Sequence, residues 1–186
     1  MTSVKVILLV AHEGYQPIEY GVTKEILKEA GMLVLTASDK QGTASSNNSS
    51  TTHVDLTCDE IDPEKIDGLF IIGGPGALEY LDTPLVHSLV QEMMSLGKPY
   101  GAICIAPRIL AKAGVLGGKK ATGWDDDKQL AALFQEHAVT YKHEAVTVDG
   151  VIVTATNPAA AEGFGKAIVR VLKQFLGIVP TYIEEL

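Results

Sequence analysis

PYGAICIAPRIL, residues 99–110, is the stretch of sequence that decides the fold. Its first part, Pro99 to Ile103, is short and apolar, as expected of a buried strand, and after Cys104 the pattern becomes helical until Gly114. Because no long loop fits between strand and helix, we expect Cys104 to lie on a sharp strand–turn–helix connection, a nucleophile elbow. Backbone N–H groups at the helix start should stabilise a thiolate and lower the pKa of the thiol. The alternative, a buried structural thiol, fits Cys58, which has no such setting.

Outward from this stretch, apolar strand patterns alternate with helical ones. Strands are predicted at 4–10, 33–35, 69–72 and 99–103, and helices at 22–30, 85–93, 109–113 and 160–175. Connections this short between strands and helices predict parallel strands with right-handed crossovers. Asp149-Gly150, between Val146–Val148 and Val151–Val153, predicts a β-hairpin. We therefore expect an open α/β sandwich with helices on both faces of a mostly parallel sheet.

The length of 186 residues suits a single domain, residues 1–186, and 46% hydrophobic residues suffice for a core. Residues 38–53 are rich in Ser, Thr and Asn with almost nothing apolar, and they predict a mobile surface loop or a hairpin tip. A single domain with one polar excursion is the expected organisation.

The charge balance excludes several classes of protein. The net charge of −8 argues against a nucleic-acid partner, which would require a basic face. No apolar run approaches the length of a membrane span, so we expect a cytoplasmic protein that binds no membrane. Two cysteines make no disulfide framework, and no Cys/His spacing fits a metal site.

Two further features complete a candidate site with Cys104. Gly73-Gly74-Pro75-Gly76 follows a buried strand, and the N–H groups of Gly73, Gly74 and Ile105 are predicted to form an oxyanion hole. Glu19 shares a helix face with Val22, Ile26 and Ala30, so it should point toward the core. If it lies beside Cys104, burial and the thiolate charge would raise its pKa and let it donate and pass protons. The alternative for Glu19 is a solvated carboxylate favoured by the helix dipole.

Several motifs resemble the ThiJ/PfpI superfamily, which includes deglycases, glyoxalases III, intracellular proteases and isonitrile hydratases. They are Ile71 to Ala77, Ala102 to Pro107, Leu110 to Leu116 and Gly118 to Thr122, within a likeness that runs from Val4 to about Leu176. The resemblance implies a flavodoxin-like three-layer sandwich, commonly a homodimer. It also implies Cys104 as the reactive cysteine, Glu19 as its partner and Gly73, Gly74 and Ile105 as the oxyanion hole.

The sequence departs from the pattern of this family in its histidines. Members with protease or glyoxalase activity often have His directly after the cysteine or near the following strand, where this chain has Ile105 and Gly123 or Trp124. A Cys–His peptidase is therefore disfavoured. Of the five histidines only His12, near the carboxyl edge of the sheet, stays a candidate.

Two other segments are candidate pocket walls. Trp124-Asp125-Asp126-Asp127 is interpreted as a solvated helix start capped by Asp125 or Asp126, the alternative being an acidic member of the site. Asn157-Pro158 either caps the last helix or lines the pocket, as the equivalent loop does in the family.

Three functions are compatible with these residues. The first is a cofactor-independent enzyme acting on small reactive carbonyls, with Cys104 as nucleophile and Glu19 as proton shuttle. The second is a non-catalytic stress or redox protein in which Cys104 is oxidised. The third is a hydrolase or hydratase acting on amides, nitriles or isonitriles.

Overall fold

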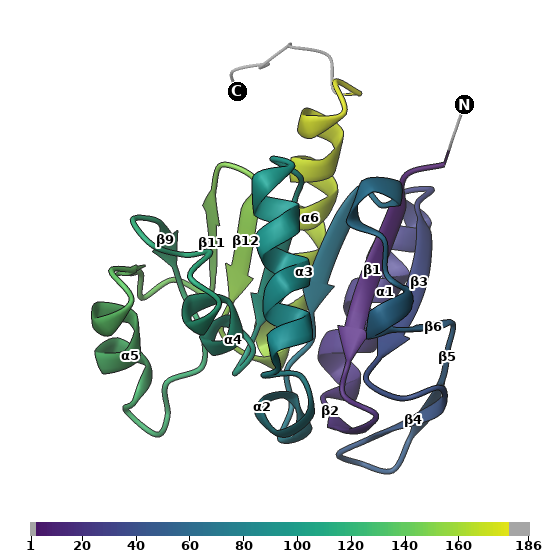
Figure 1. Ribbon diagram of the computed structural model, residues 1–186, viewed down its shortest axis with the longest axis horizontal. Coiled ribbons are helices and arrows are strands. Elements are labelled where there is room, and N and C mark those ends of the chain that lie inside the picture. Colours follow the sequence, from purple (N-terminus) through teal and green to yellow (C-terminus); the bar gives the residue numbers. More distant parts are fainter. Residues whose placement is uncertain (1–2, 179–186) are drawn as a thin grey trace.

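A seven-stranded sheet in the order β11-β12-β8-β7-β1-β3-β6 forms the centre of the computed structural model, which describes residues 3–178 (Figure 1). All neighbours in this sheet are parallel except the pair β11–β12. The strands are β1 (Lys5–Val10), β3 (Leu33–Ser38), β6 (Leu56–Thr57), β7 (Gly68–Ile71), β8 (Tyr100–Ile103), β11 (Val146–Asp149) and β12 (Ile152–Ala155). The Asp149-Gly150 turn joins the antiparallel pair, as predicted.

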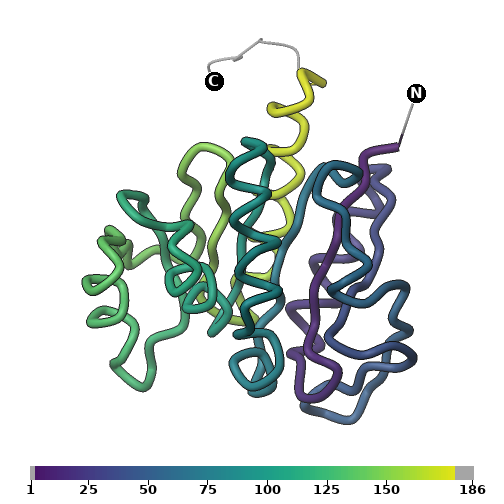
Figure 2. Tube along the Cα trace, viewed as in Figure 1, coloured from purple at the N-terminus to yellow at the C-terminus, as the bar shows by residue number. Residues whose placement is uncertain are grey.

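The strands are apolar on both faces because helices cover both. Ile7 and Leu9 of β1 enter one core cluster, while Val6 and Leu8 enter the other. Helices α3 (Pro84–Ser95) and α4 (Pro107–Lys112) pack on the first face, and α1 (Pro17–Glu29) and α6 (Ala161–Phe175) pack together on the second (Figure 2). The predicted three-layer flavodoxin-like sandwich is confirmed.

Smaller elements surround this sandwich. They are α2 (Gly76–Tyr80), α5 (Leu130–Glu136), a parallel pair of β9 (Lys120–Ala121) and β10 (Thr140–Tyr141), and the short 3-10 turns η1 (Cys58–Glu60), η2 (Pro63–Lys65) and η3 (Pro158–Ala160). Among residues 3–178, no helix combines the length and apolar character needed to cross a bilayer.

The polar segment 38–53 is a hairpin, the second of the two predicted alternatives. Strands β4 (Gly42–Ser46) and β5 (Thr51–Val54) pair antiparallel, and β4 also pairs with β2 (Glu13–Tyr15). The segment is ordered by backbone pairing and by Ala44, its one apolar anchor, which is fully buried. An isolated alanine leaves no periodic pattern, and this explains why neither the bounds of the two strands nor their pairing with β2 was predicted.

The strand order places a site at one edge of the sheet. β1 lies between β3 and β7, so the connections leave β1 and β7 toward opposite faces. Ligands of such folds bind at the carboxyl ends of the strands at this reversal. The segments that follow β1, β7 and β8 carry Glu19, Gly73 and Cys104.

Candidate functional site

Cys104 is the first residue after β8, in the turn that leads into α4. Its φ is +65°, a left-handed backbone conformation that residues with a Cβ rarely adopt. Two backbone hydrogen bonds stabilise this strained conformation: the Cys104 N–H donates to the Ala155 carbonyl, and the Cys104 carbonyl accepts from the Trp124 N–H. Such strain is typical of functional turns, and the predicted elbow is present.

Glu19, in the first turn of α1, is fully buried. Its Oε2 accepts the backbone N–H of Gly73 at 3.0 Å, whereas Oε1 has no partner with hydrogen-bond geometry among the described residues. The N–H of Gln16 donates to the Gly73 carbonyl at 2.9 Å and so fixes the start of α1 to the same loop. The solvated alternative for Glu19 is therefore wrong, and the predicted orientation toward the core is correct.

Gly73 lies between the two side chains and has no space for a Cβ. A Cβ there would lie 2.6 Å from the Cys104 Cβ and 2.8 Å from Glu19 Oε2. Glycine at this position thus lets the carboxyl group approach the cysteine. The next residue, Gly74, has a φ of +115° and passes against the backbone of Gly14 to Gln16.

The Glu19 carboxyl and the Cys104 thiol change each other's acidity. Burial raises the pKa of Glu19 to about 7, opposed by the neighbouring Cys104 thiol and by the hydrogen bond from the Gly73 N–H. Burial, together with the adjacent Glu19 charge, raises the pKa of Cys104 to about 12, opposed by the N–H groups of Ile105 and Gly74. The pair therefore loses its first proton near neutral pH and keeps its second until strongly basic pH.

This result corrects the prediction of a lowered thiol pKa. The N–H groups of Ile105 and Gly74 stabilise a thiolate, but burial and the Glu19 carboxylate destabilise it more. The raised pKa of Glu19 agrees with its prediction. Glu19 thus exchanges protons near pH 7, where a general acid–base group is most effective.

The predicted oxyanion hole also needs a correction. The Gly73 N–H donates to Glu19, which removes it from the set of free donors. The N–H groups of Gly74 and Ile105 both interact with the Cys104 sulfur and stay available to an oxygen bound there. The structure thus reduces the predicted three donors to two.

A pocket of about 470 Å³ with mainly apolar walls opens above Cys104. Its lining residues are Gln16, Glu19, Asn47, Gly74, Pro75, Cys104, Ile105, Trp124, Asp126, Asn157 and Pro158. The structure thus brings together most of the predicted candidates. None of the five histidines, all within the described residues, lines this pocket.

Trp124 forms one wall of this pocket and is fixed from behind by Arg108. The guanidinium lies 5.5 Å from the Trp124 ring centroid, donates to the Trp124 carbonyl and binds both Asp127 oxygens at 2.6 and 2.9 Å. The Arg108 hydrogen bonds hold the pKa of Asp127 below its usual value. Arg108, directly after the elbow, thus connects α4 to the loop over the pocket.

Asp125 and Asp126 of the acidic run have different roles. Asp125 accepts the Leu130 N–H at 2.8 Å at the start of α5, but the N-cap position is occupied by Gln129, so the predicted cap at Asp125 or Asp126 is wrong. Asp126 does not cap the helix but accepts the Trp124 indole N–H at 3.1 Å and lines the pocket. Asn157 precedes η3 without a side-chain cap bond, and it lines the pocket instead.

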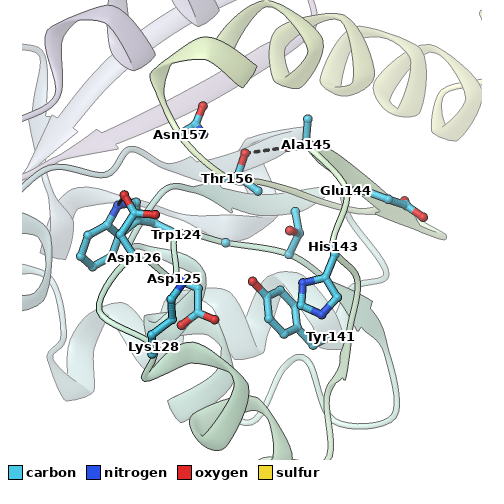
Figure 3. Close-up of a pocket in the computed structure, with 12 residues that line it drawn as sticks. Trp124, Asp125, Asp126, Lys128, Tyr141, His143, Glu144, Ala145, Thr156 and Asn157 are labelled. Carbon is cyan, nitrogen blue, oxygen red and sulfur yellow. Dashed lines mark hydrogen bonds between the residues drawn. The ribbon is translucent and has the colours of Figure 1, made fainter.

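Asp125 faces a second pocket that adjoins the first (Figure 3). Trp124 and Asp126 lie on one side of it, and Tyr141 and His143 lie side by side on the other, with ring centroids 4.3 Å apart. The sequence did not predict this pocket, because Tyr141 and His143 come from a connection without a motif.

His12 lies outside both pockets. Its Nδ1 is 2.6 Å from Asp39, its Nε2 is 3.0 Å from Lys40 Nζ, and its ring packs against Tyr80. The structure therefore does not bring His12 to Cys104. Cys58 is buried and, unlike Cys104, lines neither pocket, consistent with an inert residue.

Sequence reasoning missed Gln16 and Asn47 as pocket residues. Gln16 caps α1 by accepting the Ile18 N–H, and Asn47 follows β4 at the tip of the hairpin. A capping residue before Pro17 was a usable signal for Gln16. For Asn47 no local signal exists, because only tertiary pairing brings the hairpin to the site.

The fold and the site define a class: flavodoxin-like α/β proteins with a cysteine on a nucleophile elbow, paired with a buried glutamate. Comparison with family models agrees, since residues 4–171 match the DJ-1/PfpI family. The chain belongs to the DJ-1/PfpI family.

Relatives and solved structures support this membership. A deglycase of Pyrococcus horikoshii is 34% identical over 91% of this chain and 99% of its own, and the deglycase PfpI of Pyrococcus furiosus is 31% identical with the same coverage. A ThiJ/PfpI domain protein from Brachyspira murdochii superposes with a TM-score of 0.87 at 25% identity, over 93% of this chain and 99% of that chain. DJ-1beta of Drosophila melanogaster has a TM-score of 0.80 at 24% identity, over 96% and 100%, which shows the shared fold.

Proposed function

We propose that this protein is a cofactor-independent enzyme that converts small reactive carbonyl compounds to hydroxy acids, with methylglyoxal as the representative substrate. One observation carries the proposal: the Glu19 carboxyl, buried with one oxygen unpartnered, lies beside the strained Cys104 in a mainly apolar pocket. The relatives named deglycases are consistent with carbonyl chemistry in this family.

The first step is addition of sulfur to the aldehyde carbon. Glu19 as carboxylate takes the thiol proton while the C–S bond forms, which avoids the need for a free thiolate at a pKa of about 12. The developing oxyanion accepts hydrogen bonds from the N–H groups of Gly74 and Ile105. Glu19 then returns the proton to that oxygen and gives a hemithioacetal.

The second step is an internal redox reaction. Glu19 removes the proton from the former aldehyde carbon, the hydroxyl proton of that carbon moves to the ketone oxygen through an enediol, and Glu19 delivers its proton to the ketone carbon. The aldehyde carbon is thereby oxidised to a thioester and the ketone carbon reduced to an alcohol, so no external oxidant is required. Water then cleaves the C–S bond, releases the hydroxy acid and restores the thiol.

The test is turnover of methylglyoxal by the wild type, Cys104→Ala and Glu19→Gln, with aldehyde loss and lactate followed together. Loss of either group from a concerted pair should lower kcat/KM by at least about a hundredfold. Cys58→Ala is the matched control and should retain the wild-type rate. Lactate formation by Cys104→Ala at the wild-type rate would refute the proposal.

A redox function is the second candidate, and the same donors favour it. A sulfinate on Cys104 would accept hydrogen bonds from Gly74, Ile105 and protonated Glu19, whose pKa of about 7 keeps it partly protonated at neutral pH. A protein without carbonyl turnover that accumulates this species would support the second candidate over the first. The homodimer and the cytoplasmic location stay predictions.

A further inference from the structure

The second pocket adjoins the Cys104 pocket. The second pocket has a volume of about 360 Å³ and shares Trp124, Asp126 and Asn157 with the first. Asp126 therefore stands at the junction of the two. A ligand with its reactive carbon at Cys104 has room to extend past Asp126 into the second pocket.

The charged groups around the two pockets are predominantly negative. The Cys104 pocket is lined by Glu19 and Asp126 and by no Lys, Arg or His from residues 3–178. The second pocket adds the carboxylates of Asp125 and Glu144 against one cation, Lys128. His143 adds a positive charge only when protonated.

Neighbouring cations do not cancel this charge. Arg108 is buried and bonded to both oxygens of Asp127, so its charge is already paired. Lys142 Nζ lies 3.9 Å from Glu144, but both side chains are exposed, and solvent screens such a pair.

Each pocket also contains one buried oxygen that lacks a hydrogen-bond partner among the described residues. In the Cys104 pocket it is Glu19 Oε1, and in the second pocket it is the hydroxyl of Thr122. An unpaired buried acceptor is unfavourable, so donors from a ligand would be stabilised there. Negative lining and unpaired acceptors both favour a ligand that donates hydrogen bonds and carries positive charge.

We propose that the second pocket is a subsite for an organic cation, an ammonium or guanidinium group, and that Asp126 makes the Cys104 site select cationic over anionic ligands. No group of three or more His, Cys, Asp or Glu among residues 3–178 is arranged to hold a metal ion. The inference rests on the proposed function in one respect: the reacting group of the ligand is a carbonyl, a few bonds from the cation. The same charge repels the carboxylate of a hydroxy-acid product and favours its release.

Charged thiol reagents test this selection without any turnover. Methanethiosulfonates with a trimethylammonioethyl, a sulfonatoethyl or a methyl group react alike: the Cys104 sulfur attacks the sulfenyl sulfur, a disulfide forms and methanesulfinate leaves. Rates at Cys104 are measured by peptide mass spectrometry at low ionic strength and divided by the rates with free 2-mercaptoethanol. The methyl reagent serves as the uncharged reference.

In the wild type the normalised rate at Cys104 should be about tenfold or more higher with the cationic reagent than with the anionic one. Added salt should reduce this ratio of rates. Asp126→Asn, which keeps the shape of the side chain, should reduce the ratio several-fold. Glu136→Gln on α5 removes one exposed carboxylate that lines neither pocket and should leave the ratio unchanged. A wild-type ratio near one, or equal effects of the two variants, would overturn the charge selection.

The subsite is tested by protection of Cys104 against the methyl reagent. Betaine aldehyde carries a fixed cation beside its carbonyl, and glyoxylate carries an anion. Glu144→Gln, which lines only the second pocket, should weaken protection by betaine aldehyde and leave that by glyoxylate unchanged or stronger. Unchanged protection by betaine aldehyde would overturn the subsite. Absence of methylglyoxal turnover would refute the proposed function alone, because these readouts measure access to Cys104.

Discussion

Glu19 accepts a 3.0 Å hydrogen bond from the backbone N–H of Gly73, 54 positions away in the sequence, and this bond holds the carboxyl beside Cys104. It connects the first turn of α1 to the loop after β7, two segments that meet only because β1 and β7 are neighbours in the sheet. The geometry of the pair therefore depends on the fold as a whole.

Gly73→Ala should abolish the function of the site and destabilise the fold. Its Cβ would collide with the Cys104 Cβ, Glu19 Oε2 and the Ile103 carbonyl, all within 2.8 Å. We expect a loss of about 1–3 kcal/mol in the free energy of unfolding, measured by urea denaturation. Gly21→Ala on α1, where a Cβ meets nothing within 4 Å, is the control and should stabilise by about 0.5–1 kcal/mol. A loss of stability at Gly21 equal to that at Gly73 would contradict the steric argument.

Stability should fall with rising pH in a way that depends on Glu19. Its pKa is about 7 in the folded protein against an ordinary 4.5, so the folded state binds the proton more tightly. Below pH 4.5 Glu19 is protonated in both states, and its burial costs the folded state no ionisation energy. As the pH rises from 4.5 to 7, the free energy of unfolding falls by up to about 3 kcal/mol. Glu19→Gln should remove this dependence, and its stability relative to wild type should increase from pH 5 to pH 8. Parallel pH curves for the two proteins would show that Glu19 is ionised at its ordinary pKa.

Mild peroxide should oxidise Cys104 and spare Cys58. Both thiols have a pKa of about 12, so access decides the difference: Cys104 opens to a pocket beside the Glu19 carboxyl, whereas Cys58 is buried. Peptide mass spectrometry after graded doses measures both sites. Equal oxidation of the two cysteines in folded protein would contradict the structural difference between them.

Arg108→Lys should loosen the Trp124 wall. Lysine cannot bind both Asp127 oxygens and lie along the ring as a guanidinium does, so we expect a cost of about 1–3 kcal/mol. Trp124 is the only tryptophan, so its fluorescence reports this wall directly. The emission should shift to longer wavelength, and the indole ring should become more accessible to quenching by acrylamide. The KM for substrate should rise. An unchanged spectrum would show that Arg108 does not position Trp124.

Much of this site could be predicted because its central residues follow strong local patterns. The elbow at Cys104 follows from an apolar strand that runs directly into a helix, and the position of Glu19 follows from its spacing to apolar residues of α1. The use of the Gly73 N–H by Glu19, the raised thiol pKa and the contribution of Asn47 arise from contacts between segments distant in sequence. Local periodicity contains no information on such contacts, and the hairpin 38–53 shows this most clearly.

The central claim is that Cys104 forms the bond to the carbonyl and Glu19 moves the proton that completes the reaction. The most direct test incubates Glu19→Gln with methylglyoxal and measures, in the same sample, the reversible adduct on Cys104 by intact-protein mass spectrometry and the lactate released. The account predicts that the adduct forms more slowly, with water as the base, but still reaches equilibrium, while lactate falls by at least about a hundredfold relative to wild type. Lactate release by Glu19→Gln at the wild-type rate would contradict it.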